Sequence, residues 1–183
     1  SPQGNLANLA GMQMARQFYG LPSRTMAGLT DAKQLDFQAG AETMQNLLLY
    51  TLSGANIINE CLGVMDSIMV TSFEKWILDE ELLERVYCLE KGFDQLTSET
   101  ALEAIKAVGC GGNYLIHPST MANCRKVWMP AISDWDPYDT WKKKGSMGIL
   151  QKAHQRFKQR MESTGEKVLA PELDRDIARY IDK

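Results

Sequence analysis

Hydrophobic residues recur at helical spacing through most of the chain, and glycine and proline residues mark where the segments end. In the first half this pattern predicts helices at residues 5–19, 36–53, 72–91 and 97–108. Residues 23–29 and 55–59 lack helical spacing, and we interpret them as two short strands buried on both faces. From residue 119 onward the pattern predicts only helices, at residues 119–128, 138–144, 146–163 and 171–181.

The starts of these helices carry recognisable capping signals. Asp31 or Asp36 suits the cap of the helix over 36–53, because aspartate accepts hydrogen bonds from the first free N–H groups. Residues 71–74 (TSFE) form a capping-box pattern at the start of the helix over 72–91. The residues before it, beginning at 63–66 (GVMD), are interpreted as a loop.

The alternation of helices and strands in the first half is typical of parallel strands joined by right-handed crossovers, and therefore of an α/β fold. Two strands do not make a stable sheet covered on both faces. A closed eight-stranded barrel usually takes ~250 residues, and this chain spends its second half on helices. We therefore expect a piece of a larger α/β domain that is predominantly helical by content.

Composition narrows the class of protein. The 183 residues include 20 Lys+Arg and 23 Asp+Glu, for a net charge of −3, and hydrophobic residues make up 44%. These values are typical of a globular protein and give no electrostatic footprint for nucleic acid or an anionic membrane. No apolar stretch approaches the ~20 residues of a membrane span, and the first residues (SPQGN) carry no signal-peptide pattern. We expect a cytoplasmic protein with no nucleic-acid or membrane partner.

Cysteine and histidine usage gives no metal signature. The four cysteines form no Cys-x-x-Cys pair, and the chain has two histidines, so we predict no metal site. We expect reduced cysteines, some of them in the core.

Polar residues follow both predicted strands, where open α/β sheets and barrels bind ligands. After the first strand, Asp31 can neutralise a cationic ligand, and Lys33 can bind an anion or pair with Asp31 or Asp36. The alternative is a turn that caps the next helix. Asn59 and Glu60 end the second strand, where a carboxylate suits either a substrate or a salt bridge to a neighbouring loop.

The glycine-rich segment 109–118 is a third candidate. It lacks the established phosphate-binding patterns, and a helix C-cap followed by a flexible loop explains its glycines. His117 suits an acid/base or hydrogen-bonding role, or a structural one. Aromatic residues near the loops suit a quaternary ammonium ion, but we expect most of them to belong to the core; they are Tyr19, Phe37, Tyr114 and Trp135.

Several short runs, in order along nearly the whole chain, point to a known family. They are residues 20–25 (GLPSRT), 28–33 (GLTDAK), Asp36, 38–40 (QAG), 54–56 (GAN), Gly63, 72–75 (SFEK), 111–112 (GG), 117–118 (HP), Thr120, 136–138 (DPY) and Trp141. With these runs the chain resembles the C-terminal part of the trimethylamine:corrinoid methyltransferase family, whose members are substantially longer.

The resemblance implies the C-terminal portion of a (β/α)8 TIM barrel followed by a helical extension. Residues 1–95 would be the closing β/α units, and residues 96–183 a mostly helical C-terminal extension of the same domain. Because most of the barrel wall would be missing, we expect exposed apolar strand edges and self-association into a homo-oligomer.

The resemblance also implies an activity. Family members move a methyl group from a methylated amine to the cob(I)alamin of a partner corrinoid protein, so the cofactor is supplied by the partner and none is bound directly. The archaeal trimethylamine branch uses pyrrolysine, and none stands in this sequence, which favours the branch acting on quaternary amines such as glycine betaine.

Carried onto this sequence, the resemblance suggests substrate contacts but no catalytic residue. Glu60 or Asp31 would offset the ammonium charge, while Asn59 and His117 would hydrogen-bond a substrate carboxylate or position a loop; Lys33 and Tyr114 are further candidates. The first alternative is a non-catalytic helical module that binds a corrinoid protein or another subunit. The second is an unrelated small α/β enzyme.

Overall fold

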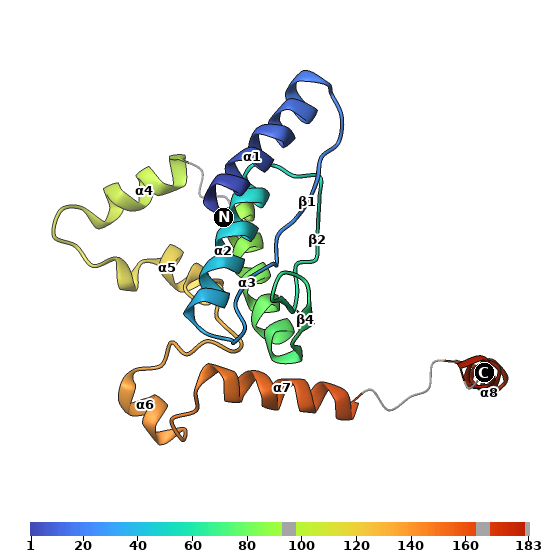
Figure 1. The fold of residues 1–183 in the computed structure, drawn as a ribbon. Helices are drawn as coiled ribbons and strands as arrows, with labels where there is room; N and C mark the ends of the chain where they lie inside the picture. The colour runs from blue at the N-terminus through green and yellow to red at the C-terminus, as the bar shows by residue number, and fades with distance from the viewer. Residues whose placement is uncertain (93–97, 164–168, 182–183) are drawn as a thin grey trace.

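The structure, a computed structural model, describes residues 1–92, 98–163 and 169–181, and it is predominantly helical (Figure 1). The first half contains α1 (Pro2–Gln13), a π-helical turn η1 (Met14–Phe18), β1 (Arg24–Met26), α2 (Phe37–Leu52), β2 (Ile57–Asn59), β3 (Val64–Met65), β4 (Val70–Thr71) and α3 (Phe73–Lys91). The second half contains α4 (Ser98–Val108), the 3-10 turn η2 (Tyr114–Ile116), α5 (Pro118–Asn123), α6 (Tyr138–Lys143), α7 (Ile149–Ser163) and α8 (Pro171–Ile181). Thr97, predicted as the first residue of the fourth helix, lies outside the described residues.

The two predicted strands pair in parallel, as expected. Arg24 lies opposite Ile57 and Met26 opposite Asn59, and α2 makes the connection from β1 to β2. The prediction that both faces of these strands are buried is wrong for this chain, because helices cover only the face that carries Thr25. On the other face, Ile57 is 58% exposed and Met26 36%.

A β-hairpin replaces the loop that was predicted before α3. β3 and β4 pair antiparallel, and their connection includes Asp66, Ser67 and Ile68 with positive φ angles of 49°, 51° and 76°. Strands of two residues are too short to give an alternating pattern, so the sequence carries no signal for them.

The main core lies between α1, β1, α2 and α3. Its buried members are Met12, Ala27, Leu47, Tyr50 and Val86. A second, smaller core of Ile77, Ile132 and Ala153 joins α3 to α7 and to the segment before α6. The second half of the chain is therefore attached to the first through α3, as the ribbon shows for α7 (Figure 1).

The helix caps confirm part of the capping prediction. The Asp36 carboxylate accepts hydrogen bonds from the N–H groups of Gln38 (2.9 Å) and Ala39 (3.2 Å), so Asp36 rather than Asp31 caps α2. Ser72 caps α3 by accepting from the Lys75 N–H at 3.2 Å. The capping-box interpretation is wrong, because the third residue after the cap is a lysine rather than a glutamate.

One predicted helix ends early. α5 stops at Asn123 instead of continuing to Trp128. The Trp128 ring lies beneath the Arg85 guanidinium, 4.7 Å from its carbon, and packs edge-on against Trp135 with 5.6 Å between centroids. These contacts with α3 hold the segment in a non-helical path.

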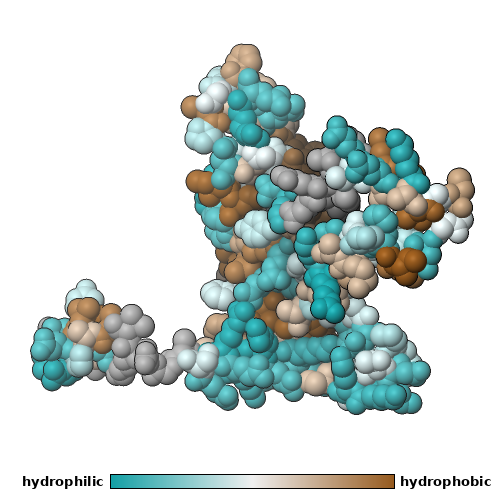
Figure 2. All heavy atoms as spheres, turned by 180° about the vertical axis from the view of Figure 1, so that it is seen from behind, coloured by the Kyte–Doolittle hydropathy of each residue, from teal (hydrophilic) through white to brown (hydrophobic). Residues whose placement is uncertain are grey.

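Apolar side chains remain on the surface of the second half. Figure 2, the view from behind, shows hydrophobic patches among hydrophilic ones, including on α8, which stands away from the rest of the molecule. Leu173, Ile177 and Tyr180 of α8 are exposed. In the described part of the chain, no helix has the length and apolar character needed to cross a membrane.

Candidate functional site

The loops that leave β1 and β2 lie against each other. The Gly28 N–H donates to the Glu60 carbonyl oxygen at 3.0 Å, and the Ala27 N–H donates to the Asn59 carbonyl oxygen at 3.3 Å. A Cβ atom at Gly28 would lie 2.2 Å from the carbonyl carbon of Cys61, a contact that real structures do not show. Glycine at position 28 is therefore required for the two loops to meet.

Three of the predicted site residues follow these neighbouring strands at the same end of the sheet. Asp31 is exposed, and its carboxylate accepts a hydrogen bond from the Ser67 hydroxyl in the β3–β4 connection. Glu60 is exposed as well and adopts a φ of 54°. The Asn59 Oδ1 atom is buried and has no hydrogen-bond partner among the described residues. This end of the sheet thus exposes two carboxylates and encloses one unsatisfied acceptor.

Lys33 lies beside this group but does not pair as predicted. Its Nζ atom lies 3.0 Å from Asp66 Oδ1 and donates to the backbone oxygen of Asp31 at 2.6 Å. Pairing with the carboxylate of Asp31 or Asp36 is corrected to pairing with Asp66, whereas the alternative role of Lys33 in binding an anion stays a prediction. Asp66 belongs to the connection between β3 and β4, a hairpin that was not predicted from the sequence.

Tyr114 and His117 lie in the second half of the chain. Tyr114 is in η2, and His117 stands at the start of α5. The His117 Nδ1 atom accepts from the Ser119 N–H at 3.2 Å and lies 2.7 Å from the Ser119 hydroxyl, so His117 acts as the N-cap of α5. Within the described ranges, no hydrogen bond or ion pair connects either residue to Asp31 or Glu60. The structure therefore brings Asp31, Asn59 and Glu60 to one sheet end and leaves His117 and Tyr114 outside that group.

The expectation that most loop aromatics are core residues is wrong. Tyr19 is 64% exposed, Phe37 91%, Tyr114 45% and Trp135 54%.

Cys61 is partly buried, whereas the other three cysteines are exposed, and all four are free. Among the described residues, no group of three or more histidine, cysteine, aspartate or glutamate side chains is arranged to hold a metal ion.

Glu42 of α2 supports the Asp31 loop and is not among the residues predicted from the sequence. Its Oε2 atom accepts from the Thr30 hydroxyl at 2.6 Å and from the Asp31 N–H at 2.9 Å. The Thr30 hydrogen bond in particular lowers the pKa of Glu42 below its usual value. An available signal was that Glu42 is the single charged residue in the sequence of α2.

A buried ion pair in α3 was missed as well. Lys75 and Asp79 are 1% and 2% exposed, and the Lys75 Nζ atom lies 2.5 Å from Asp79 Oδ2. Burial raises the pKa of Asp79, and the charge of Lys75 opposes that shift. The signal was their spacing, because positions 75 and 79 share a helix face with the apolar residues Leu82 and Val86.

A cavity of about 630 Å³ borders the Asp31 loop on the side of β1 that faces away from β2. α1, α2 and β1 line it, with Arg24, Asp31 and Asn46 among its residues. Asn5 donates to the Asn46 side chain at 2.7 Å, and Asn46 donates to the Leu29 backbone oxygen at 3.2 Å. Asn59 and Glu60 do not line this cavity, so it is not the space between the two carboxylates.

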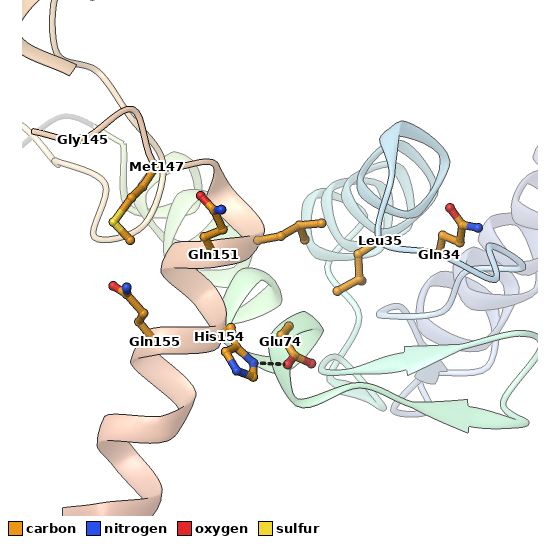
Figure 3. A pocket seen from close by; sticks show the side chains of 9 residues that line it. Gln34, Leu35, Glu74, Gly145, Met147, Gln151, His154 and Gln155 are labelled. Atoms are coloured by element: carbon orange, nitrogen blue, oxygen red, sulfur yellow. Dashed lines mark hydrogen bonds and ion pairs between the residues drawn. The ribbon is translucent and has the colours of Figure 1, made fainter. Parts of the chain in front are cut away.

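A larger cavity of about 910 Å³ lies between α7, the start of α3 and residues 34–35 (Figure 3). The Nδ1 atom of His154 lies 2.8 Å from Glu74 Oε1 at its wall, and this hydrogen bond lowers the pKa of Glu74. Gln34 and Gln151 line it too, and none of the predicted site residues does. Its position makes it a junction between the two halves rather than the sheet-end site.

Comparison with known proteins gives a match over the whole chain. The trimethylamine methyltransferase (MTTB) family model matches residues 1–183. The chain is 36% identical over 182 residues to the glycine betaine methyltransferase of Desulfitobacterium hafniense, covering 99% of this chain and 38% of that protein. It is 30% identical over 183 residues to the trimethylamine methyltransferase MttB of Methanosarcina barkeri, covering 100% of this chain and 37% of that protein.

A third relative matches part of the chain. The L-carnitine:corrinoid methyltransferase of Eubacterium limosum is 37% identical over 117 residues, or 63% of this chain and 24% of that protein. The chain thus spans less than two fifths of the length of these relatives.

Proposed function

Because the chain belongs to the trimethylamine methyltransferase family, we propose that it is part of an enzyme that moves a methyl group from a methylated amine to a corrinoid. The observation that carries this proposal is the family match from the first residue of the chain to the last. The corrinoid belongs to a partner protein in this proposal, and no cofactor is bound directly by the chain.

The proposed substrate is a quaternary amine such as glycine betaine. Identity is 36% to the glycine betaine enzyme and 37% to the shorter matched part of the L-carnitine enzyme. It is 27–30% to the trimethylamine enzymes matched over the whole chain and 32% to one matched over 85% of it. Betaine and carnitine both carry a trimethylammonium group. A quaternary nitrogen leaves as a neutral amine without gaining a proton, so the proposal needs no general acid.

The chemistry is a displacement at a methyl carbon. The partner's corrinoid supplies a cobalt(I) nucleophile, which takes the methyl carbon while the C–N bond breaks and its electron pair stays on nitrogen. The chain's own task is to bind and orient the cation, because alignment of the reacting atoms supplies much of the rate. Asp31 and Glu60 would offset the positive charge, and Asn59, whose Oδ1 atom is buried without a described partner, would hydrogen-bond a substrate carboxylate through its amide N–H or position a loop.

The candidates outside this group stay predictions from the sequence. His117 would hydrogen-bond a substrate carboxylate or position a loop, and Tyr114 and Lys33 are further candidates. The described contacts of His117 are those of a helix cap.

The proposed setting is the wall of a (β/α)8 barrel. In this proposal residues 1–95 are closing β/α units, and residues 96–183 are a helical extension of the same domain. The parallel β1–α2–β2 unit and the exposed side chains of Met26 and Ile57 support it, since side chains from strands across the barrel would cover these two residues. Self-association is a second way of covering these residues, which is why we expect a homo-oligomer.

The test is methyl transfer by the product of the complete gene. Reduced cobalamin, and a corrinoid protein where one is in hand, is mixed with glycine betaine, L-carnitine or trimethylamine, and its methylation is followed by absorbance. We expect transfer from the quaternary amines. Glu60→Gln and Asp31→Asn are expected to raise the KM of the cation, whereas Glu103→Gln, at an exposed position of α4, is the matched control.

Other results decide against parts of the proposal. Transfer from trimethylamine with none from a quaternary amine would refute the substrate class. Binding of a corrinoid protein without any methyl transfer would favour the alternative, a non-catalytic helical module. The exposed apolar side chains of α4 and α8 support that alternative. The presence of further barrel strands in the same reading frame would count against that alternative.

A further inference from the structure

A buried ion pair near the start of α3 is not used by the proposed function. Lys75 and Asp79 are 1% and 2% exposed, which makes them two of the most enclosed side chains among the described residues. Removing two charges from water is costly, and apolar residues of similar volume are often as stable in the same place. Stability alone is therefore a weak reason for this pair, and its contacts suggest another.

The pair holds both loops that leave the sheet. The Lys75 ammonium donates to the Gly28 backbone oxygen at 3.0 Å, to the Thr43 hydroxyl at 3.0 Å and to Asp79 at 2.5 Å, which uses all three of its protons. The same Asp79 oxygen accepts from the Gly63 N–H at 2.8 Å. One pair of side chains thus connects the loop after β1, the loop after β2 and α2.

These anchor points lie close in sequence to the candidate carboxylates. Gly28 stands three residues before Asp31, and Gly63 stands three residues after Glu60. At both glycines the backbone has no spare room. A Cβ atom at Gly28 would strike Cys61, and Gly63, with a φ of 76°, packs directly beneath the Trp76 ring.

We propose that Lys75 and Asp79 are positioning residues that set the separation of Asp31 and Glu60 for a cationic substrate. This inference rests on the proposed function. The pair supplies directional hydrogen bonds, yet it is neutral as a whole. A lone lysine at this place would repel a cation at the sheet end, whereas a neutral pair leaves the field of the two carboxylates intact.

The test compares two variants of the complete protein. Lys75→Met with Asp79→Leu removes both charges and keeps an apolar side chain of similar length at each position, so the helix keeps a packed face. Glu80→Gln is the control, because Glu80 lies on α3 as well but pairs with Arg160 of α7 rather than with either loop. Hydrogen exchange reports on residues 28–31 and 60–63 without any need for activity, and kinetics give KM and kcat for each amine.

We expect the double variant to keep the exchange protection of the α2 and α3 core while losing that of the two loops. We expect kcat/KM for glycine betaine to fall about 10–100-fold, mostly through KM, since small misplacements have effects of this size. The preference for betaine over trimethylamine should shrink, whereas the half-saturating concentration of the corrinoid protein should not change. Glu80→Gln should alter neither loop exchange nor KM.

Two results would overturn this inference. Unchanged loop exchange in the double variant refutes it whether or not the protein is active, and lost loop protection with an unchanged KM reduces the pair to a structural role. The proposed function fails separately, when the unmodified protein transfers no methyl group from any amine in the panel. In that case the inference falls with it, and any change in exchange marks the pair as structural only.

Discussion

The two halves of the chain are held together in different ways. In residues 1–92, helices and strands enclose a core of their own and a buried ion pair. In the described part of the second half, only Ile132 and Ala153 are buried, and both pack beneath α3. The difference indicates a direction of dependence: the second half needs α3, whereas the first half contains most of what stabilises it.

The contacts that attach the second half run through one face of α3. Glu81, almost fully buried, accepts from the Ile132 N–H at 2.6 Å and the Ser133 N–H at 3.0 Å. At the start of α3, Phe73 stacks on Phe157 with 4.7 Å between ring centroids. None of these side chains belongs to the main core, so each contact can be removed without touching that core.

Asp79→Ala should have the largest effect, because it leaves Lys75 buried without its carboxylate. We expect a loss of about 3–5 kcal/mol in the stability of α2 and α3, the usual cost of breaking a buried pair. The second half should lose protection too, since α7 packs on α3. Hydrogen exchange followed by mass spectrometry on the complete protein measures both regions. Loss confined to the second half would break the proposed dependence.

Glu81→Ala should release the second half alone. It removes the acceptor of the Ile132 and Ser133 N–H groups, and leaving buried donors unpaired costs about 1–3 kcal/mol. We expect faster exchange in residues 126–137 and unchanged exchange in α1 and α2. Glu84→Ala, exposed on the same helix, is the control. Equal loosening of both halves would contradict the comparison.

Acid should loosen the second half first, with a smaller effect than Glu81→Ala. Burial raises the pKa of Glu81, but hydrogen bonds from Ser133 and Ile132 outweigh it and lower the pKa overall; the hydrogen bond from His154 lowers that of Glu74. Their stabilisation is complete above the unfolded value of about 4.3 and is lost as pH falls through the lowered values.

Asp79 behaves in the opposite sense under acid. Burial raises its pKa, so its protonation favours the folded state as pH falls. Exchange rates corrected for their intrinsic pH dependence, measured from pH 7 down to pH 4 and below, should show α7 losing protection before the core of the first half. Simultaneous loss in both regions would count against this.

Glu80→Gln should have the smallest effect. Glu80 and Arg160 lie 2.6 Å apart, with side chains 43% and 49% exposed, and such surface pairs contribute about 0–1 kcal/mol. The exchange of α7 should change barely at all, and a loss as large as that of Glu81→Ala would show that the surface pair, not the buried carboxylate, attaches the second half.

Much of the first half could be predicted because local signals and tertiary packing agree there. Asp36 and Ser72 mark helix starts, Gly54 and Gly92 mark ends, and α2 and α3 follow within one residue. The parallel pairing of the two strands followed from their alternation with helices. The same rule placed Asp31, Asn59 and Glu60 at one sheet end, while their role toward a substrate stays a prediction.

The features that escaped prediction depend on contacts between distant segments. The connection of the β3–β4 hairpin has positive φ angles at Asp66, Ser67 and Ile68. None of the three is glycine, the residue that most often marks such angles in a sequence. α5 ends early because Trp128 is held by Arg85, 43 positions earlier in the printed sequence. His154 meets Glu74 across 80 positions, and no local pattern carries that information.

The β1–β2 pair has an outer edge on each side within the described residues. Each edge is a row of amide and carbonyl groups with the geometry of a sheet and no neighbour, which is the arrangement that templates strand addition between molecules. If this segment is produced by itself, soluble yield should depend on protein concentration. A short peptide able to pair with β1 should act as a chaperone by occupying that edge.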